Sequence, residues 1–146
     1  MILERFKVTD KIAVVTGGTR GIGLSIAHAL GEAGAKLVVT SRTDKFGGLE
    51  SLQKANYDVS FFEADITDKQ VPQKIIDYTL DKHGSIDILV NNAGVAQHGE
   101  MEEFNDDLLD KIMNINVDAL FRMCRSAITP MKKQGEGVIL NIGSIS

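Results

Sequence analysis

An apolar run that leads directly into a glycine-rich turn is the feature that most constrains the fold of this chain. Residues 12–15 read Ile-Ala-Val-Val, and residues 16–23 read Thr-Gly-Gly-Thr-Arg-Gly-Ile-Gly. An unbroken apolar run of this length is typical of a strand that is buried on both faces of a parallel sheet. From Gly21 to Ala33, apolar residues recur at helical spacing, and the inward face is expected to include Ile22, Ile26 and Ala27. The glycine-rich turn is therefore predicted to join a buried strand to a helix.

Apolar runs and amphipathic segments alternate along the rest of the chain. The pattern predicts strands at 11–16, 36–40, 59–63, 86–90 and 138–142, and helices at 21–33, 44–55, 68–83 and 105–133. Gly34 and Gly84 suit the left-handed residue that follows a helix. This alternation predicts an α/β fold in which a parallel sheet carries helices on both faces, a three-layer α/β/α arrangement. With 146 residues and no linker, residues 1–146 are expected to form a single domain.

Composition narrows the class of protein. The net charge of −4 and the lack of a Lys/Arg-rich block argue against nucleic-acid binding. Charged residues interrupt residues 1–10, which excludes the apolar core of a signal peptide there, and no apolar stretch is long enough to span a bilayer. The single cysteine, Cys124, excludes an internal disulfide and fits a cytoplasmic location; its apolar surroundings favour a buried structural residue over a reactive thiol. No spacing of His, Cys, Asp and Glu suggests a metal site.

The glycine-rich turn has the properties of a phosphate cradle. At the start of a helix, backbone N–H groups and the positive end of the helix dipole favour an anion. Gly17, Gly21 and Gly23 permit a tight turn and a close approach of the backbone to a pyrophosphate. Their spacing is Gly-x-x-x-Gly-x-Gly, which differs from the better-known Gly-x-Gly-x-x-Gly, and glycines also mark ordinary loops.

Three further motifs follow in order: Asn91-Asn92-Ala93-Gly94 after the fourth strand, Asn116 in the long helix, and Gly143-Ser144 after the fifth strand. Together with the glycine-rich turn they make the chain resemble the short-chain dehydrogenase/reductase family. The resemblance implies a Rossmann-type sheet with strand order 3-2-1-4-5 and hydride transfer between NAD(P)(H) and a small carbonyl or alcohol substrate. It assigns catalytic roles to Asn116 and Ser144. It also implies a set of cofactor-binding residues: Thr16, Gly17, Thr19, Arg20, Gly21, Ile22, Gly23, Ser41, Arg42, Asp65, Ile66, Asn92, Ala93 and Gly94.

The end of the second strand bears on the choice of cofactor. An acidic residue at this place commonly binds the ribose hydroxyls of NAD, whereas a nearby arginine accommodates the extra phosphate of NADP. By resemblance, Ser41 stands at the acidic position and Arg42 follows it, with Arg20 in the glycine-rich turn as a second cation. The pattern therefore favours NADP(H) over NAD(H). The alternative is that both arginines are ordinary solvated residues.

Several site residues have alternative interpretations. Asp65 resembles the adenine-contacting aspartate of the family, and it could instead cap a helix, as could Thr67 or Asp68. The amide of Asn116 is implied to hold a water in the proton path, with helix capping as the alternative. Ser144 would hydrogen-bond the reacting oxygen, and Ser146 is a second candidate. His98 stands where substrate pockets of the family begin, but its sequence context favours a surface loop position slightly.

The family's tyrosine and lysine, spaced as Tyr-x-x-x-Lys, should follow the serine, and they are absent from these 146 residues. Such a lysine lowers the high pKa of the tyrosine that delivers the proton. Tyr78 and Lys82 have this spacing, but they precede the fourth strand on a helix that should pack against a face of the sheet. We therefore expect a domain that is truncated after the fifth strand and is inactive by itself. The alternative is a catalytically inactive dinucleotide-binding fragment or regulatory module.

The segment 105–133 is apolar over more than one stripe. Such a helix is covered on more than one side, either by a deep position in the domain or by another subunit. The second possibility predicts a homo-oligomer, a dimer or tetramer, that is built through this segment.

Overall fold

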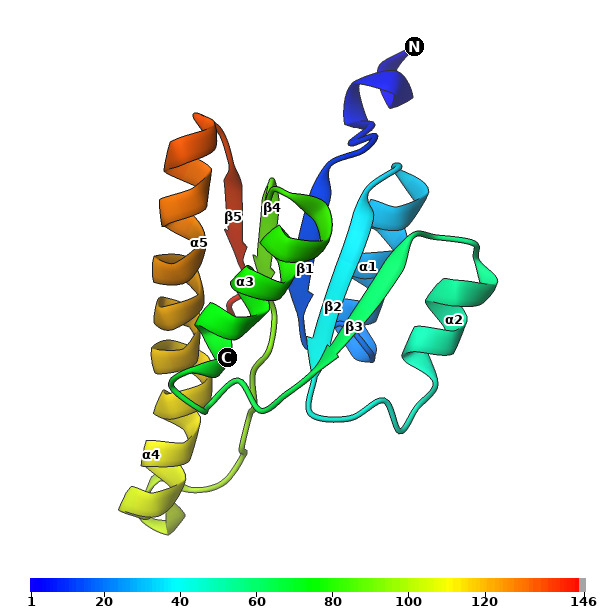
Figure 1. Cartoon of the computed structure of the whole chain (residues 1–146). Coiled ribbons are helices and arrows are strands. Elements are labelled where there is room, and N and C mark those ends of the chain that lie inside the picture. Colours follow the sequence, from blue (N-terminus) through cyan, green and yellow to red (C-terminus); the bar gives the residue numbers. More distant parts are fainter. Residues whose placement is uncertain (145–146) are drawn as a thin grey trace.

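The sheet is parallel and five-stranded, with the strand order β3-β2-β1-β4-β5 (Figure 1). In the computed structural model, which describes residues 1–144, the strands are β1 (Ile12–Thr16), β2 (Lys36–Ser41), β3 (Val59–Glu63), β4 (Ile88–Asn91) and β5 (Val138–Asn141). β1 is buried along its whole length between β2 and β4. The expected strand order is therefore confirmed, and β1 is the central strand that the apolar run predicts.

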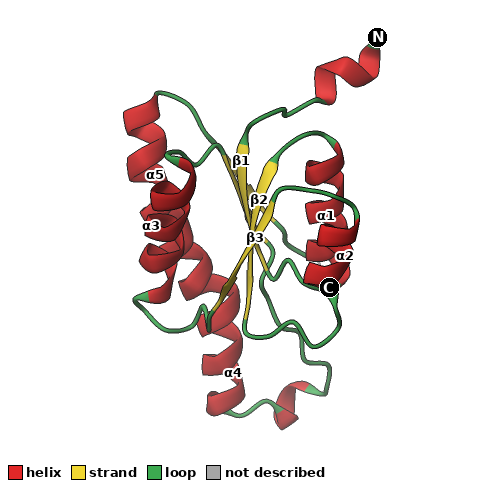
Figure 2. Ribbon diagram, turned by 45° about the vertical axis from the view of Figure 1, so that its right-hand side comes forward, coloured by secondary structure: helices red, strands yellow, loops and turns green. Residues whose placement is uncertain are grey.

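Helices cover both faces of this sheet, which confirms the three-layer arrangement (Figure 2). One face carries α1 (Gly21–Glu32) and α2 (Gly48–Lys54), and the other carries α3 (Val71–His83) and α5 (Leu120–Gln134). Short 3-10 helices lie at Ile2–Phe6 and Met101–Glu103. Gly34 and Gly84 have φ angles of 98° and 80°, so both occupy the left-handed region expected after a helix.

Two apolar clusters hold the layers together, one on each face of the sheet. Val15, Val39 and Leu52 belong to the cluster beneath α1 and α2. On the opposite face, Val14, Ile75 and Met123 belong to the cluster beneath α3 and α5. Because neighbouring strand residues point to opposite faces, the unbroken apolar run of β1 supplies both clusters.

Two details differ from the sequence prediction on the α1–α2 face. The first is that α2 begins at Gly48 instead of Asp44, because the Asp44 carboxylate accepts a hydrogen bond from Leu49 N at 3.2 Å and caps the helix from outside. The second is that Ile22, expected on the inward face of α1, is 66% exposed. Ile22 lies in the first turn of α1, beside the glycine-rich turn at the edge of the sheet, and α1 buries its later residue Ala27 instead.

The predicted helix 105–133 is interrupted. It begins as α4 (Asp106–Met113), where the Asn105 side chain accepts a hydrogen bond from Leu108 N, and it ends as α5. Between them lies a π-helical segment, Asn114–Ala119, which contains Asn116. π-helical turns insert an extra residue into a helix and are frequent at functional sites.

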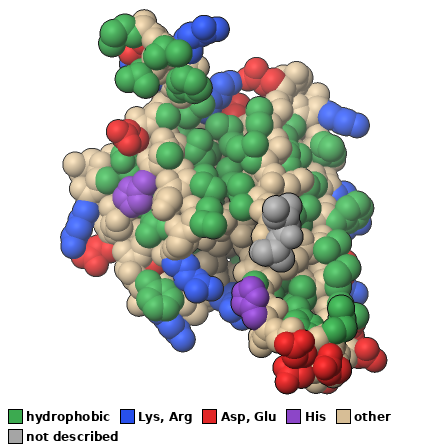
Figure 3. All heavy atoms as spheres, turned by 180° about the vertical axis from the view of Figure 1, so that it is seen from behind, with side chains coloured by type: hydrophobic (Ala, Val, Ile, Leu, Met, Phe, Trp, Pro, Cys, Tyr) green, Lys and Arg blue, Asp and Glu red, His purple; other side chains and the backbone are tan. Residues whose placement is uncertain are grey.

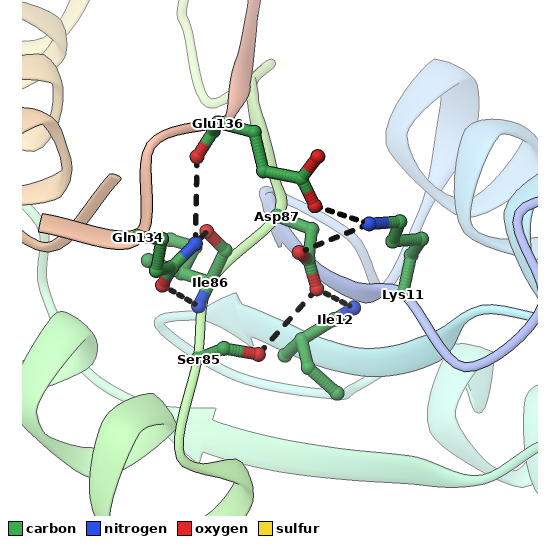
Figure 4. Close-up of polar contacts among 7 residues, drawn as sticks. All are labelled: Lys11, Ile12, Ser85, Ile86, Asp87, Gln134 and Glu136. Atoms are coloured by element: carbon green, nitrogen blue, oxygen red, sulfur yellow. Dashed lines mark hydrogen bonds and ion pairs between the residues drawn. The ribbon is translucent and has the colours of Figure 1, made fainter. Parts of the chain in front are cut away.

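Polar contacts tie the amino ends of three strands together (Figure 4). The Gln134 amide accepts a hydrogen bond from Ile86 N at 3.1 Å and donates one to Ile86 O at 3.0 Å. Lys11 forms ion pairs with Asp87 and Glu136, and the hydrogen bond from Lys11 to Glu136, followed by the field of Asp87, raises the lysine pKa. These contacts lie at the end of the sheet opposite the cleft described below.

Candidate functional site

A cleft opens at the carboxyl ends of the strands. Open α/β sheets bind ligands at this edge, where the strand order reverses direction between β1 and β4. The lining residues come from the ends of β1, β2, β3 and β4 and from the π-helical segment: Thr16, Gly17, Arg20, Thr40, Ser41, Arg42, Ala64, Asp65, Ile66, Thr67, Asn92, Ala93, Gly94, Val95 and Ile115.

Thr16 and Asn92 join the ends of β1 and β4 at the floor of the cleft. The buried Thr16 hydroxyl accepts hydrogen bonds from Asn92 N and Ala93 N, each at 3.0 Å. In return, Asn92 Nδ2 donates to Thr16 O at 3.1 Å and to Gly17 O at 3.2 Å. The glycine-rich turn and the Asn-Asn-Ala-Gly segment therefore form one hydrogen-bonded unit, although 76 residues separate Thr16 from Asn92.

Gly17 and Gly23 show two different reasons for glycine in the turn. Gly17 has a φ angle of 64°, in the left-handed region that favours glycine. A Cβ atom on Gly23 would lie 2.2 Å from Gly17 O and 2.4 Å from Asn92 Nδ2. The helix α1 starts at Gly21, and its cap residue Arg20 makes no side-chain hydrogen bond to the first turn. The N–H groups of this turn thus keep their capacity to bind an anion at the cleft.

Asp65 follows β3 on the wall of the cleft. Its carboxylate accepts hydrogen bonds from Thr67 N at 2.9 Å and Thr67 Oγ1 at 2.7 Å. These two bonds, followed by the field of Arg42, lower the pKa of the carboxyl group. The helix α3 begins only at Val71, so Asp65 shapes a turn at the cleft and does not cap that helix.

Asn116 contacts the cleft through Val95. Its Oδ1 accepts a hydrogen bond from Val95 N at 2.9 Å, and its Nδ2 donates to Val95 O at 2.8 Å. The amide thus fixes the segment that leaves Gly94, and each of its two polar ends keeps one more hydrogen-bonding position. This contact is the local role of the side chain, in place of the helix capping considered as an alternative.

The remaining sequence candidates lie around the cleft. Ser144 is exposed after β5, and Ser146 falls outside the described residues. His98 is exposed in the loop after Val95 and does not line the cleft. Lys82 lies over the ring of Tyr78, with Nζ 5.9 Å from the ring centroid. Both residues belong to α3, on the face of the sheet that also carries α5. Neither residue lines the cleft, in agreement with the position of the pair before the fourth strand.

The family model described as short chain dehydrogenase matches residues 11–146. The chain belongs to the short-chain dehydrogenase family. Among its relatives, the chain is 39% identical to a D-beta-hydroxybutyrate dehydrogenase of Rhizobium meliloti, over 92% of this chain and 54% of the relative. It is 36% identical to an NADP-dependent (R)-specific alcohol dehydrogenase of Lentilactobacillus kefiri, over 95% and 56%.

A solved structure of a short-chain dehydrogenase has the same fold. It is a gluconate 5-dehydrogenase from Burkholderia cenocepacia in complex with NADP and tartrate. The TM-score is 0.89 at 32% identity, and the match covers 99% of this chain and 57% of that one. The chain therefore spans about half the length of the short-chain dehydrogenases that it matches.

Sequence reasoning missed several residues that line the cleft. Thr40, Ala64, Thr67, Val95 and Ile115 line it, and each is next to or near a residue singled out by a motif. Their contribution depends on how strand ends meet in space, which a single local motif does not encode. A strand end that lies beside a glycine-rich turn in the predicted sheet order is the one signal that points to Thr40.

Charge and surface character separate this site from the rest of the molecule. Acidic side chains gather at the lower right of Figure 3, over the segment that holds Glu100, Glu102, Glu103, Asp106 and Asp107, and none of them lines the cleft.

Among the described residues, no group of three or more His, Cys, Asp or Glu side chains is placed to hold a metal ion. No helix within residues 1–144 has both the length and the apolar character needed to cross a membrane.

Proposed function

We propose that this protein is an NADP(H)-dependent oxidoreductase that interconverts a carbonyl group and an alcohol on a small substrate. The observation that carries the proposal is the position of the glycine-rich turn. It leads into α1, whose first turn has no side-chain cap from Arg20, and it lines the same cleft as Arg20 and Arg42. The turn suits the pyrophosphate, and the arginines suit the additional phosphate of NADP(H). Two similar proteins support this choice, one described as NADP-dependent and one in complex with NADP.

The residues of the cleft fit a dinucleotide. Gly17 and Gly23 keep the turn tight, since a Cβ atom at either position would press on protein atoms of the turn or of the Asn92–Ala93 segment. A tight turn of this kind would let the backbone approach a pyrophosphate closely. Ser41 and Arg42 at the end of β2 would hold the ribose and its phosphate, and Asp65 with Ile66 would border the adenine. Asn92, Ala93 and Gly94 would border the nicotinamide half, because they continue from β4 on the other side of the turn.

When NADPH is bound, it supplies a hydride to the carbonyl carbon, and the oxygen then requires a proton. The Ser144 hydroxyl is the group of this chain that we assign to hydrogen-bond that oxygen, because it follows β5 at the carboxyl edge. Asn116 would hold the segment after Gly94 in place through Val95 and keep one amide position available for a water. These groups position the substrate and do not deliver the proton.

Residues 1–146 contain two tyrosines, and neither lines the cleft. Tyr57 packs edge-on against His28, and Tyr78 packs against Phe62 on the face of the sheet that α3 and α5 cover. A protein consisting of these residues alone is therefore expected to bind NADP(H) and to show negligible reductase activity. For such a protein the alternative proposal is a dinucleotide-binding module. Turnover by a preparation of verified mass would exclude that alternative.

The cofactor proposal is tested by the variant Arg42→Asp. Fluorescence titration should show tighter binding of NADPH than of NADH by the wild-type protein. In the variant, the new carboxylate repels the 2′-phosphate and can accept hydrogen bonds from ribose, so the ratio of the two affinities should move toward NADH by at least about tenfold. Arg5→Asp, at the exposed 3-10 helix near the amino end of the sheet, is the charge-matched control. An unchanged ratio in Arg42→Asp removes Arg42 from the proposal.

We also propose that the outer face of α4, the π-helical segment and α5 packs against a second copy of the chain. α5 buries Met123, Ala127 and Met131 against the sheet, and apolar residues remain exposed along the opposite side: Leu109, Met113, Val117, Phe121 and Ile128. The stripe supports a dimer or tetramer, because monomeric proteins rarely expose a continuous apolar surface of this kind. Phe121→Asp should lower the mass measured by sedimentation, and an unchanged mass would contradict the proposal.

A further inference from the structure

Three basic side chains border one hollow beside the cofactor cleft. The hollow is lined by Thr19, Arg20, Ser41, Arg42, Thr43, Lys45 and Phe46. Within residues 1–144, neither arginine nor Lys45 forms an ion pair with a carboxylate, whereas Lys54, for example, pairs with Glu50 at 2.6 Å. Like charges that share a site repel each other, and an anion between them relieves this repulsion. The hollow therefore suits a multiply charged anion.

The loop that carries two of these cations is fastened to the glycine-rich turn by a chain of hydroxyl groups. Thr19 Oγ1 donates a hydrogen bond to Ser41 Oγ at 2.9 Å, and Ser41 Oγ donates to Thr43 O at 2.6 Å. Thr19 is only 3% exposed, so its end of this chain of bonds is buried, whereas the bond from Ser41 to Thr43 O lies at the surface. Thr19 Oγ1 also lies 3.3 Å from Thr43 O, so Thr19 contacts the residues on both sides of Arg42. The position of the Arg42 backbone therefore depends on these bonds.

The far end of the loop rests on the same residue. A Cβ atom on Gly48, the first residue of α2, would lie 2.0 Å from Thr19 O, so the backbone of α2 meets the backbone of Thr19 directly. Asp44 caps α2 through Leu49 N. The loop from Arg42 to Gly47 therefore has both ends anchored on Thr19, one by side chains and one by close backbone packing.

From these contacts we propose that Thr19 is a positioning residue for the 2′-phosphate of NADP(H), and that Lys45 is a third cation for this phosphate besides Arg20 and Arg42. The inference rests on the proposed NADP(H) function. In this proposal, Thr19 holds the loop that carries Arg42 and Lys45 at the hollow bordered by Arg20 before the cofactor binds. Such preorganisation improves affinity, because the loop does not have to be ordered on binding. The effect should be specific to the 2′-phosphate, since the pyrophosphate would lie at the helix start.

The test compares adenosine 2′,5′-bisphosphate with adenosine 5′-monophosphate, two probes that differ only in the 2′-phosphate. Calorimetric titration of the full-length protein gives the ratio of their affinities. Lys45→Met should reduce the preference for the bisphosphate by about threefold to tenfold, as expected for loss of one partly exposed charge, with little change for the monophosphate. Lys74→Met, on the opposite face of the sheet, is the matched control and should leave the ratio unchanged.

Thr19→Val removes the hydroxyl and keeps the shape of the side chain. Thr19→Val should reduce the preference for the bisphosphate over the monophosphate. Thr19→Ser keeps the hydroxyl and should show the preference of the wild-type protein. A purely structural role would lower the affinity for both probes together. If the wild-type protein prefers the bisphosphate and neither Lys45→Met nor Thr19→Val changes the ratio, the inference is wrong while the NADP(H) proposal stands. If the wild-type protein binds the two probes equally or not at all, both proposals are overturned.

Discussion

The side chain of Asn116 pairs with both the N–H and the C=O of Val95, at 2.9 and 2.8 Å, as a neighbouring strand would. The pair joins the π-helical segment to the residues that follow β4, where no strand is available to satisfy this backbone. A Cβ atom on Gly94 would lie 3.3 Å from Asn116 Oδ1, so the contact also limits what fits before Val95. Asn116 thereby sets the path of the cleft wall from inside a helix.

Replacing Asn116 by alanine should destabilise the protein and loosen this wall. Both polar groups of Val95 lose their partner, and the expected loss of unfolding free energy is about 1–3 kcal/mol. Urea denaturation measures this loss, and NADPH titration should show weaker binding by the variant. Asn114→Ala is the matched control, because the Asn114 side chain has only a 3.4 Å contact with Arg122, and its effect should be within about 0.5 kcal/mol. Equal losses in the two variants would contradict the role of the Val95 pair.

Thr16 should be more sensitive to removal of its hydroxyl than to loss of its methyl group. Thr16→Val leaves Asn92 N and Ala93 N without their acceptor at a buried position, which should cost about 1–3 kcal/mol. Thr16→Ser keeps the oxygen and should retain both hydrogen bonds. Thermal and urea unfolding of the two variants make the comparison. A serine variant that is less stable than the valine variant would show that packing, and not the hydrogen bonds, dominates at this position.

Gly23 and Gly21 should differ in their tolerance of alanine. Gly23→Ala places a Cβ atom 2.2 Å from Gly17 O, so the turn or the helix has to move, and we expect a loss of more than about 2 kcal/mol together with weaker cofactor binding. Nothing lies within 4 Å of a Cβ atom on Gly21, whose φ of 54° adds only a backbone cost of about 1–2 kcal/mol. Unfolding free energies measure both losses. Tolerance of alanine at Gly23 would argue against the tight turn seen here.

The layers of the fold could be predicted from sequence because local patterns determine them. The apolar run of β1 needs burial on both faces, and Gly34 and Gly84 end their helices with the left-handed φ angles that glycine allows. The strand order came from resemblance to a family, since no local pattern states which strands are neighbours. The motifs around Gly17 and Asn92 also reached the correct edge of the sheet, because the carboxyl ends of parallel strands meet there.

The finer arrangement of the site could not be predicted because it depends on contacts between distant residues. The sequence of the π-helical segment also fits the spacing of an ordinary α-helix, and Asn114 and Asn116 have low but acceptable helix propensity. Its register shift is visible only once Val95, 21 residues away, occupies both ends of the Asn116 amide. Likewise, the bond between Thr19 and Ser41 depends on how the first turn lies over β2.

His83 should make the stability of the protein depend on pH near neutrality. It ends α3, and its Nε2 atom is buried with no hydrogen-bond partner among the described residues. Burial lowers the pKa of the ring below its ordinary value of 6.5; Asp58 opposes this shift, and Lys82 and Lys36 add to it. The unfolded chain therefore takes up a proton before the folded protein does as the pH falls. The stability linked to the neutral ring is complete above pH 6.5 and decreases as the pH falls from 6.5 toward the folded-state pKa.

The variant His83→Gln keeps a polar side chain of similar size and cannot take up a proton in this range. Unfolding free energies from urea denaturation, measured at intervals from about pH 5 to pH 8, should therefore fall less steeply on acidification in the variant than in the wild-type protein. Asp65 adds the same sign of dependence at lower pH, because its pKa is also depressed, and it is present in both proteins. The difference between the two curves isolates His83. Parallel curves across this range would show that the ring is protonated as readily in the folded protein as in the unfolded chain.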